Sequence, residues 1–575
     1  MSTNTLVHAA ADRVKAVLPN AETLGTMRRS PRRDLVSGLT VAIVALPLAL
    51  GFGITSGAGA QAGLVTAVIA GALAAVFGGS NLQVTGPTGA MTVVLVPIVH
   101  SYGIDGVMTV GLMAGVILVA LALLRAGRAM SYVPVPVIEG FTLGIAAVIG
   151  LQQIPGAFGV KTPTGNNPAV VAAEAVGDFA KHPHWTSIGV ALAVAAVLLL
   201  GARWRPAIPF SLLAVVAATT AVWGLGLPTA SIGHLPSGLS APSTSFFEAS
   251  HVGSLLPSAL AVAALAALES LMSASAADAM SVSEHHDSNR ELFGQGLANI
   301  AAPLFGGVAA TGAIARTAVN VRSGAASRLA SLVHAAILAV IVFAAAPLVS
   351  HIPRAALAGV LIATAIRMVE VGSIKALAKA SRGETAILAL TATVTLVSTL
   401  VNAVIVGMVV AAVVALTKVS KAARLEQVPL HADLPPADHH EQEQALLGEH
   451  IVAYRLDGPL LFAAAHRFLL ELTETADVKV VILRMSRISV IDSSGARVLA
   501  DAIDKLTKRG VLVLVSGVRP EHHRPLDALG TLDGLRTAGH VFTTTPEAIA
   551  FAHTHLSGTG IIPAPRTGER AGAPC

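Results

Sequence analysis

Charged, cysteine and aromatic residues are all scarce in this chain of 575 residues. Only 12% of its residues are charged, about half of the ~25% found in soluble domains, which is too little polar surface to keep a particle of this size in water. The single cysteine, Cys575, excludes an intrachain disulfide and a zinc site built on cysteines. Apolar residues make up 54% of the chain, and the mean hydropathy is +0.71. We therefore expect a polytopic membrane protein.

The apolar residues form fourteen segments separated by short polar connections. Several are shorter than the ~20 residues that a straight membrane helix needs, most clearly the third and the tenth. The segments lie near 35–50, 61–78, 87–99, 106–124, 133–151, 186–202, 208–226, 253–277, 292–305, 313–321, 329–349, 354–371, 384–399 and 401–417.

The basic residues orient these segments. Four arginines between residues 28 and 33 precede the first segment, and most other Lys and Arg fall in connections on that same side, whereas 225–252 on the opposite side has none. Because basic residues favour the cytoplasm, fourteen spans with both termini cytoplasmic is the consistent arrangement, in the plasma membrane. The basic residues behind the net charge of +5 are thus explained by membrane orientation. We therefore expect no nucleic-acid binding.

The composition changes abruptly after residue 417. Residues 421–449 are rich in Glu, Gln, His and Pro, as in a linker, whereas in 450–556 strand-like runs such as VKVVILRM alternate with helical stretches such as ARVLADAIDKLTKRG. That alternation predicts a small α/β domain. We expect a cytoplasmic tail over 1–30 without a cleavable signal, a membrane domain over 31–420, and a disordered tail over 557–575.

Two short segments about seven spans apart share one pattern. NLQVTGPTGAMTVVL and VAATGAIARTAVNV both follow Phe-Gly-Gly, and both contain small residues, a Gly and then a short apolar helix. An odd number of spans between them makes the two copies inverted. Matching interruptions in two halves of a transporter point to its binding site, although glycine-rich packing kinks are an alternative.

Half-helices that begin inside the membrane can bind an anion at their N-terminal ends. Their first N–H groups are unpaired and carry the positive end of the helix dipole, so two of them facing one another bind negative charge without a charged side chain. Pro87 suits a first helical turn because its missing N–H costs nothing there, and Thr88 and Thr92 offer hydroxyl groups on the same side.

The stretches GLTVAIVALPLALGFGITSGAGAQAGL, FGGSNLQVTGPTGAMTVV, ELFGQGLANIAAPLFGG and TGAIARTAVN resemble the SulP family of sulfate-permease-type anion transporters. SVIDSSGARVLADAI resembles the signature of its C-terminal STAS domain. The resemblance covers nearly the whole chain and implies an α-helical fold of two inverted seven-helix repeats. A core domain (spans 1–4 and 8–11) would move against a gate domain (spans 5–7 and 12–14) like an elevator, usually in a homodimer.

The resemblance and the broken helices together predict a substrate site between spans 3 and 10. We expect its residues to be Pro47, Thr85, Thr88, Gly89, Thr311, Gly312, Ala313 and Arg316. A guanidinium beside a helix N-terminus strengthens an anion site and matches a planar carboxylate or bicarbonate. An alternative role for Arg316 is that of a structural partner for Glu269.

Glu139, Glu269 and Arg316 are ionisable residues predicted inside spans, where a charge costs about 2.5–3.5 kcal/mol on the most lenient scale. Ser273 lies four residues after Glu269 and shares its helix face. We expect Glu269, Ser273 and Glu139 to serve coupling. Sodium-coupled bicarbonate members, which this chain resembles in the first and third spans, would have a hydroxyl where Ile314 stands. Isoleucine offers no ligand to a hard cation, so a proton is favoured over sodium.

Two polar motifs have simpler explanations. His285 and His286, with Glu284 and Asp287, could suggest a metal site, but they fall in a polar loop and a solvated loop is favoured. Ser494 matches the serine that is phosphorylated in soluble STAS relatives, whereas a helix cap by Asp492 or Ser493 explains the same motif. The STAS domain would then serve trafficking, dimer contacts or a cytosolic partner.

The sequence therefore predicts a secondary active transporter of small anions that is proton-coupled or exchanges anions, without a cofactor. Bicarbonate or another small oxyanion such as sulfate ranks before dicarboxylates, and Leu48, where a Gln is usual, loosens a sulfate assignment. Alternatives are a sodium-coupled bicarbonate symporter, a nucleobase permease of the same fold and a membrane-anchored STAS receptor. We expect no enzyme, because no nucleophile–base or metal constellation is evident.

Overall fold

The computed structural model describes residues 25–128, 133–165, 167–204, 210–235, 238–281, 285–398, 400–422, 424–428, 450–460 and 478–561. The chain divides into two compact units, Met1–Ala411 and Ala412–Cys575. Most of the expected N-terminal tail, linker and C-terminal tail lies outside the described residues.

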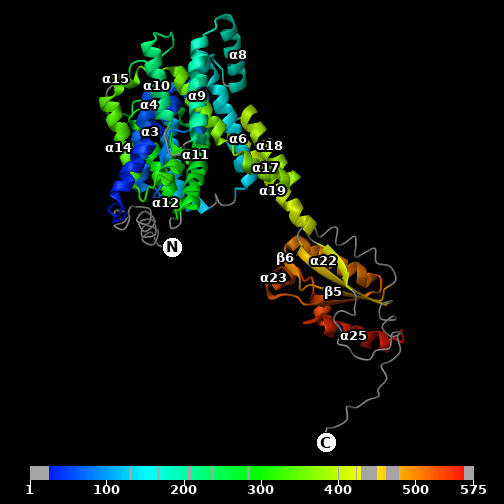
Figure 1. Cartoon of the computed structure of the whole chain (residues 1–575). Coiled ribbons are helices and arrows are strands. Elements are labelled where there is room, and N and C mark those ends of the chain that lie inside the picture. Colours follow the sequence, from blue (N-terminus) through cyan, green and yellow to red (C-terminus); the bar gives the residue numbers. More distant parts are fainter. Residues whose placement is uncertain are drawn as a thin grey trace. The chain divides into compact units, whose positions relative to one another are not determined.

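The first unit consists almost entirely of helices (Figure 1). Its first half contains α3 (Pro31–Thr55), α4 (Ala60–Phe77), the short strand β1 (Thr85–Gly86), α5 (Gly89–Leu123), α6 (Val135–Gln152), α7 (Ile154–Phe158), α8 (Pro168–Lys181), α9 (Trp185–Trp204) and α10 (Phe210–Gly224).

The second half repeats this order after a 3-10 turn, η2 (Ala249–His251). It contains α11 (Val252–Met280), α12 (Ser288–Leu304), the short strand β2 (Thr311–Gly312), α13 (Ile314–Arg322), α14 (Leu329–Ala344), α15 (Ala346–Val349), α16 (Arg354–Met368), α17 (Val371–Ala380), α18 (Arg382–Val397) and α19 (Leu400–Ala422), which continues into the second unit.

Each of the fourteen expected segments overlaps a helix. Among the described residues, eight helical stretches are long and apolar enough to cross a bilayer, and α10 and α14 are shorter apolar helices. The third and fourth segments are the two parts of α5, which is interrupted at Gly103, where φ is 68°. The protein is thus mostly helical and passes the membrane several times. Helices α8 and α17 are additional: α8 lies between α7 and α9, and α17 lies between α16 and α18.

The two halves pack in an exchanged pattern. Helix α3 packs against α14 as α11 packs against α5, and α6 packs against α18 as α16 packs against α9. Gly140 of α6 lies against the backbone of Leu388, and Gly359 of α16 lies against the backbone of Ala191. Equivalent glycines at equivalent crossings are expected where small residues let membrane helices approach closely.

Glycines also bring α3 and α4 together. A Cβ atom at Gly63 of α4 would overlap the carbonyl oxygen of Ala49, and one at Gly53 of α3 would overlap the carbonyl oxygen of Gly59. This close approach, next to Pro47 inside α3, fixes the position of the first span beside the polar centre of the unit.

The second unit is an α/β domain. Its sheet has the order β3 (Arg424–Val428), β4 (Ile451–Leu460), β5 (Val480–Arg484), β7 (Leu512–Ser516) and β8 (Val541–Phe542), and β6 (Ile488–Ile491) pairs with β4. All pairs are parallel except β3–β4. Strand β3 lies in the stretch expected to be linker, where pairing with β4 satisfies its backbone.

Helices cover the sheet of the second unit on both faces. Alternate residues of β4 and β5 pack against α22 (Ser493–Lys508), α23 (Pro520–Ala528) and α24 (Asp533–Thr537) on one side and against α25 (Thr545–Gly558) on the other. This two-sided burial explains the continuous apolar runs of its strands.

We expect Gly63→Ala to destabilise the membrane unit, because a methyl group cannot fit against the Ala49 carbonyl and overpacking costs about 1–3 kcal/mol. Thermal unfolding of the purified protein in detergent should show a lower midpoint. Gly177→Ala in the exposed helix α8, where nothing lies within 4 Å of the added carbon, should leave the midpoint unchanged or raise it. Equal midpoints for the two variants would contradict the packing argument.

Candidate functional site

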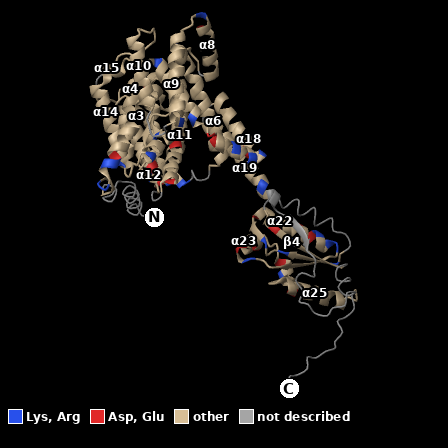
Figure 2. Cartoon of the chain, in the orientation of Figure 1, with Lys and Arg blue, Asp and Glu red and all other residues tan. Residues whose placement is uncertain are grey.

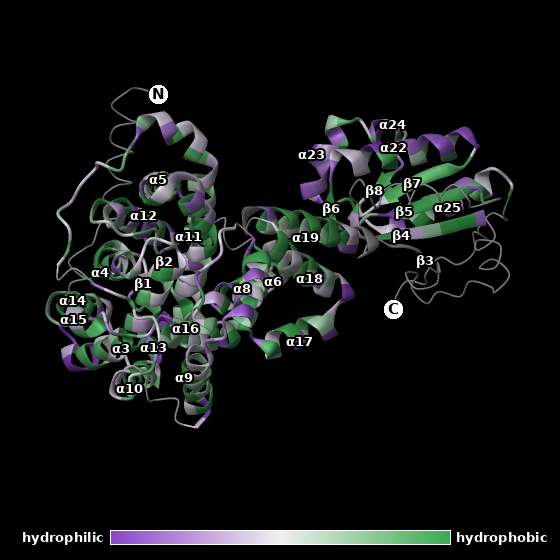
Figure 3. Cartoon of the chain, turned by 90° about the horizontal axis from the view of Figure 1, so that it is seen from above, coloured by the Kyte–Doolittle hydropathy of each residue, from purple (hydrophilic) through white to green (hydrophobic). Residues whose placement is uncertain are grey.

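Two extended segments cross at the centre of the membrane unit, between the helices of both halves (Figure 3). Strands β1 and β2 pair antiparallel, Thr85 opposite Gly312 and Gly86 opposite Thr311. The pairing continues through the Ala313 amide, which donates to the Val84 carbonyl at 2.9 Å. Backbone groups inside a membrane need partners from the protein itself, and each segment supplies them to the other.

A half-helix begins directly after each extended segment. Helix α5 starts at Gly89 after Thr88, and α13 starts at Ile314 after Ala313, and neither start is capped by a side chain. Pro87, expected in the first turn, instead precedes the helix, and its carbonyl is used as an acceptor. The first amides of both half-helices therefore have no capping acceptor at their positive ends.

Glu269 of α11 lies between the two extended segments. Its Oε2 accepts hydrogen bonds from the Thr88 hydroxyl at 2.8 Å and from the Thr311 hydroxyl at 2.6 Å. The neighbouring Ser270 accepts from the amide of Gly312 at 2.9 Å. One carboxylate thus joins the third, eighth and tenth of the expected spans.

Arg316 lies in the first turn of α13 and only 1% of its surface is exposed. Its Nη2 donates to the Pro87 carbonyl at 2.7 Å, while Nη1 has no hydrogen-bond partner. The guanidinium lies against Gly86, where an added Cβ would come within 2.6 Å of Nη1. Within the part of the chain that the structure describes, Arg316 makes no ion pair with Glu269. Arg316 thus donates to a backbone carbonyl through Nη2, and its Nη1 amino group has no hydrogen-bond partner.

The other expected site residues are distributed around this centre. Pro47 and Ala313 are buried in the same core. The side chain of Thr85 accepts from Gln295 at 2.7 Å. Gly89 lies against Ile149 of α6 and Phe52 of α3, which places the start of α5 beside an expected gate helix.

Two expected coupling residues have partners elsewhere. The hydroxyl of Ser273 lies 2.9 Å from that of Thr317, the residue after Arg316 in α13. Glu139 of α6 accepts a hydrogen bond from Ser373 of α17 at 2.6 Å, so the structure does not bring Glu139 together with Glu269.

Several buried polar residues that brace the crossing were not anticipated. Asn299 of α12 pairs with both the amide and the carbonyl of Ala310, and Asn320 of α13 donates to the Leu82 carbonyl. Glu291 accepts from the amides of Gly79 and Ser80. The signal in the sequence is a set of lone polar residues in short helices that are otherwise made of small apolar residues.

The polar loop before α12 forms a local hydrogen-bond chain. His286 Nδ1 lies 2.7 Å from Asp278 Oδ2, and Ser288 Oγ lies 3.1 Å from His286 Nε2. The amides of Asn289 and Arg290 donate to Asp287, the N-cap of α12. Among the described residues, no group of three His, Cys, Asp or Glu side chains is placed to hold a metal ion. Glu284 lies outside them.

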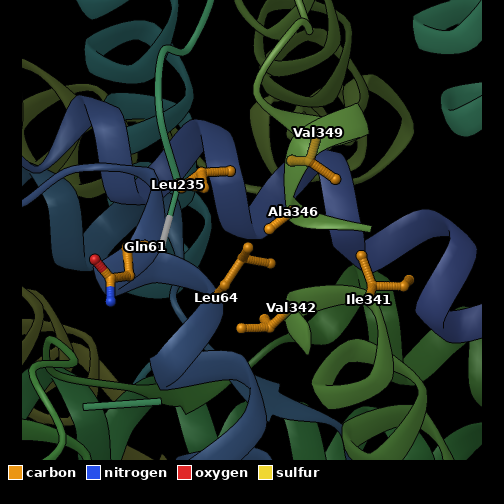
Figure 4. Close-up of a pocket in the computed structure, with 7 residues that line it drawn as sticks. All are labelled: Gln61, Leu64, Leu235, Ile341, Val342, Ala346 and Val349. Carbon is orange, nitrogen blue, oxygen red and sulfur yellow. The ribbon is translucent and has the colours of Figure 1, made fainter. Parts of the chain in front are cut away.

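A small apolar pocket lies away from this chemistry (Figure 4). It is lined by Gln61, Leu64, Leu235, Ile341, Val342, Ala346 and Val349. None of these residues belongs to β1, β2 or the half-helices, and a mostly aliphatic lining offers nothing to an anion.

In the second unit, Asp492 caps helix α22 by accepting from the amide of Gly495 at 2.6 Å. The expected capping role of Asp492 is thus present. Ser494 is exposed on the first turn of the same helix, and its hydroxyl is not needed for the cap.

Comparison with known proteins places both units. Residues 32–391 match the model of the sulfate permease family, and residues 445–548 match that of the STAS domain. The chain is 33% identical over 512 residues to the putative sulfate transporter YvdB of Bacillus subtilis, covering 87% of this chain and 94% of the relative. It is 30% identical over 522 residues to the bicarbonate transporter BicA of Synechocystis sp., covering 87% and 91%.

Solved structures give the same result. The transmembrane domain of a cyanobacterial bicarbonate transporter BicA matches with a TM-score of 0.60 at 31% identity, over 67% of this chain and 98% of that one. The overall structure of SLC26A9 matches with a TM-score of 0.80 over 97% and 96% of the two chains. At 18% identity, this second likeness shows the fold alone.

We expect Asp492→Ala to loosen the first turn of α22, because loss of an N-cap costs about 1 kcal/mol. Hydrogen exchange of the full-length protein should then be about 5-fold faster at the amides of that turn. Ser494→Ala should leave the exchange rates unchanged. Faster exchange in the Ser494→Ala variant, but not in Asp492→Ala, would contradict the assignment of the cap to Asp492.

Proposed function

Since the chain belongs to the sulfate permease family, we propose that it is a secondary active transporter of small anions, of the bicarbonate, sulfate or carboxylate class. The observation that carries this proposal is the buried N–H group of Arg316 that has no partner, beside two uncapped half-helix N-termini. A buried donor left unpaired is costly, and an anion is the ligand that satisfies such donors together.

The anion would lie between the starts of α5 and α13. Amides at Gly89 and Ile314 would bind it with the helix dipoles, and Arg316 would supply the balancing charge. Ile314 is 40% exposed, which fits a site open to solvent on the α13 side. Thr88 and Thr311 would contribute hydroxyl groups.

The position of Glu269 supports the proposed proton coupling. In this structure the carboxylate occupies the hydroxyls of Thr88 and Thr311, which are the groups that the anion would use. An anion next to an ionised carboxylate is repelled, strongly so in a site with little water. A proton on Glu269 removes that repulsion, so anion and proton would enter together.

The relatives favour a small oxyanion. YvdB is named as a putative sulfate transporter and BicA as a bicarbonate transporter. We therefore rank bicarbonate or another small oxyanion before dicarboxylates. The likeness to BicA keeps a sodium-coupled bicarbonate symporter as the second candidate. Ile314 begins α13 without an oxygen ligand for sodium, and for this reason we favour the proton.

Movement of a core against a gate would carry the anion across. Two polar contacts join expected core helices to an expected gate helix. Thr92 of α5 hydrogen-bonds Gln152 at the end of α6, and Thr55 of α3 accepts from Gln153, which follows α6. Such few polar contacts between large apolar surfaces can be exchanged in an elevator movement. We further propose a homodimer in the plasma membrane with both termini cytoplasmic, and a STAS domain that binds a cytosolic partner.

Uptake of labelled bicarbonate, sulfate and succinate into proteoliposomes, with and without proton or sodium gradients, tests the function. A proton gradient should drive at least one of the three. Absence of uptake of every one, together with altered partner binding by Ser494→Ala, would instead favour a membrane-anchored receptor. Uptake of uracil alone would favour a nucleobase permease.

We expect Arg316→Ala to abolish uptake, because a hydrogen bond to a charged group contributes about 1.5–3 kcal/mol, or about 10- to 100-fold in affinity. Arg316→Lys should retain part of the binding, since it keeps the charge. Arg322→Gln changes an exposed arginine of the same helix and serves as the control. Gel filtration of each variant checks folding. Normal uptake by a folded Arg316→Ala protein would remove this residue from the site.

We expect Glu269→Gln to keep its contacts with Thr88 and Thr311 but to lose the ability to exchange a proton. Uptake by this variant should no longer follow the proton gradient, as measured from the initial rate at several external pH values. Glu139→Gln, made in parallel, should keep the dependence on pH, because Glu139 bonds to α17 instead. A wild-type pH profile in Glu269→Gln would exclude the proposed coupling role.

A further inference from the structure

Helix α17 connects α16 to α18 and contributes no fully buried residue. Its sequence, VGSIKALAKA, is amphipathic: Ser373, Ile374 and Leu377 are half-buried, whereas Val371 and Ala378 are exposed. Because it joins the ends of two apolar helices, we expect it at the level where the hydrocarbon meets water. Short amphipathic helices with basic residues lie in that layer.

Basic residues gather around α17. Lys375 and Lys379 are four residues apart, so they share one face of the helix, and both are exposed. Arg367 near the end of α16 and Arg382 at the start of α18 are exposed as well. In Figure 2, blue ribbon segments mark Lys and Arg around the labels α18 and α19.

These four basic residues form no ion pair with an acidic residue of the described part of the chain. Within the described residues, the ion pairs do not include any of them. Two acidic residues, Glu370 and Glu384, fall between positions 367 and 384, and a third, Glu139, accepts a hydrogen bond from Ser373 of α17. Four basic residues against three carboxylates leave a small excess of positive charge beside exposed apolar side chains.

Helix α8 provides an internal comparison. It precedes α9 as α17 precedes α18, and α9 and α18 hold equivalent places in the two halves. Yet α8 carries Glu174 and Asp178, and its lysine, Lys181, already pairs with Asp178 at 3.3 Å. Free positive charge thus occurs on one of the two equivalent helices, on the side where the basic connections lie.

We propose that α17 binds the headgroups of anionic lipids, with Lys375 and Lys379 as the principal contacts and Arg367 and Arg382 beside them. Val371 and Ala378 enter the acyl boundary while the lysines extend to the phosphates. A strongly negative bilayer surface is the partner that satisfies both the free charge and the exposed apolar face.

The hydrogen bond between Ser373 and Glu139 connects the lipid-binding helix α17 to helix α6 of the transporter. It fixes α17 to α6, the helix whose other end meets Thr92 and Gly89 at the anion site. Glu139 therefore acts as the anchor of the lipid-binding helix.

Tryptophan fluorescence tests the contact without any measurement of transport. Ala378→Trp places the reporter on the exposed face, and the full-length protein is reconstituted into phosphatidylcholine vesicles. A minority of the lipid is brominated phosphatidylglycerol in one set and brominated phosphatidylcholine in the other. Fluorescence of the parent protein is subtracted to remove the native tryptophans. Quenching by the brominated phosphatidylglycerol should be the stronger, and inorganic phosphate should not reduce it.

Charge variants then identify the contacts. In the Ala378→Trp background, Lys375→Gln and Lys379→Gln should each lower the preference for phosphatidylglycerol about 5-fold. Lys375→Arg with Lys379→Arg should retain the preference, and Lys181→Gln on α8 is the matched control that should not change it. Equal quenching by both lipids, or no quenching by either, would overturn the proposal. Transport could fail while this contact remains, so the two proposals are separable.

Discussion

The structure depends on one constraint: two chain segments leave the helical state inside a membrane, where no water is available to pair their backbone groups. The antiparallel pair of β1 and β2 satisfies part of this requirement. Side chains from the surrounding helices satisfy the rest, including Asn299, Asn320 and Glu291. Asn320 and Glu291 belong to the second half and brace the first extended segment, so the first half-helix is positioned in part by the other repeat. The proposed anion site is the place where this arrangement leaves hydrogen-bond donors without partners.

Opposite charges stand close to those donors without pairing with each other. Arg316 is held by the Pro87 carbonyl, and Glu269 is held by two threonine hydroxyls. A direct ion pair would neutralise both and leave little reason for a ligand to enter. Kept apart, the guanidinium retains a free N–H group and the carboxylate retains the ability to compete with an incoming anion. Selectivity and coupling would therefore rest on the same few atoms.

Apolar periodicity and the distribution of basic residues were sufficient to predict the helices, the short third and tenth segments and the α/β domain. The convergence of Thr88, Thr311 and Arg316 on one centre was predicted from the two matching interrupted segments together with the family resemblance. The partners of individual side chains were harder to predict from the sequence. Ser273 shares a helix face with Glu269 but meets Thr317, and Glu139 meets a helix absent from the prediction. Helical spacing gives the face of a residue, whereas its partner depends on which other helix packs there.

The pairing of β1 with β2 has a consequence for how the protein is made. Thr88 and Thr311, which meet at 3.2 Å, are 223 residues apart in the chain. At about 5–20 residues per second, the ribosome needs roughly 10–45 s to supply the second after the first. During that interval the first extended segment lies in or near the bilayer with its backbone unpaired. The newly made first half must therefore be sheltered, by insertion machinery or by delayed entry into the lipid, until its counterpart arrives.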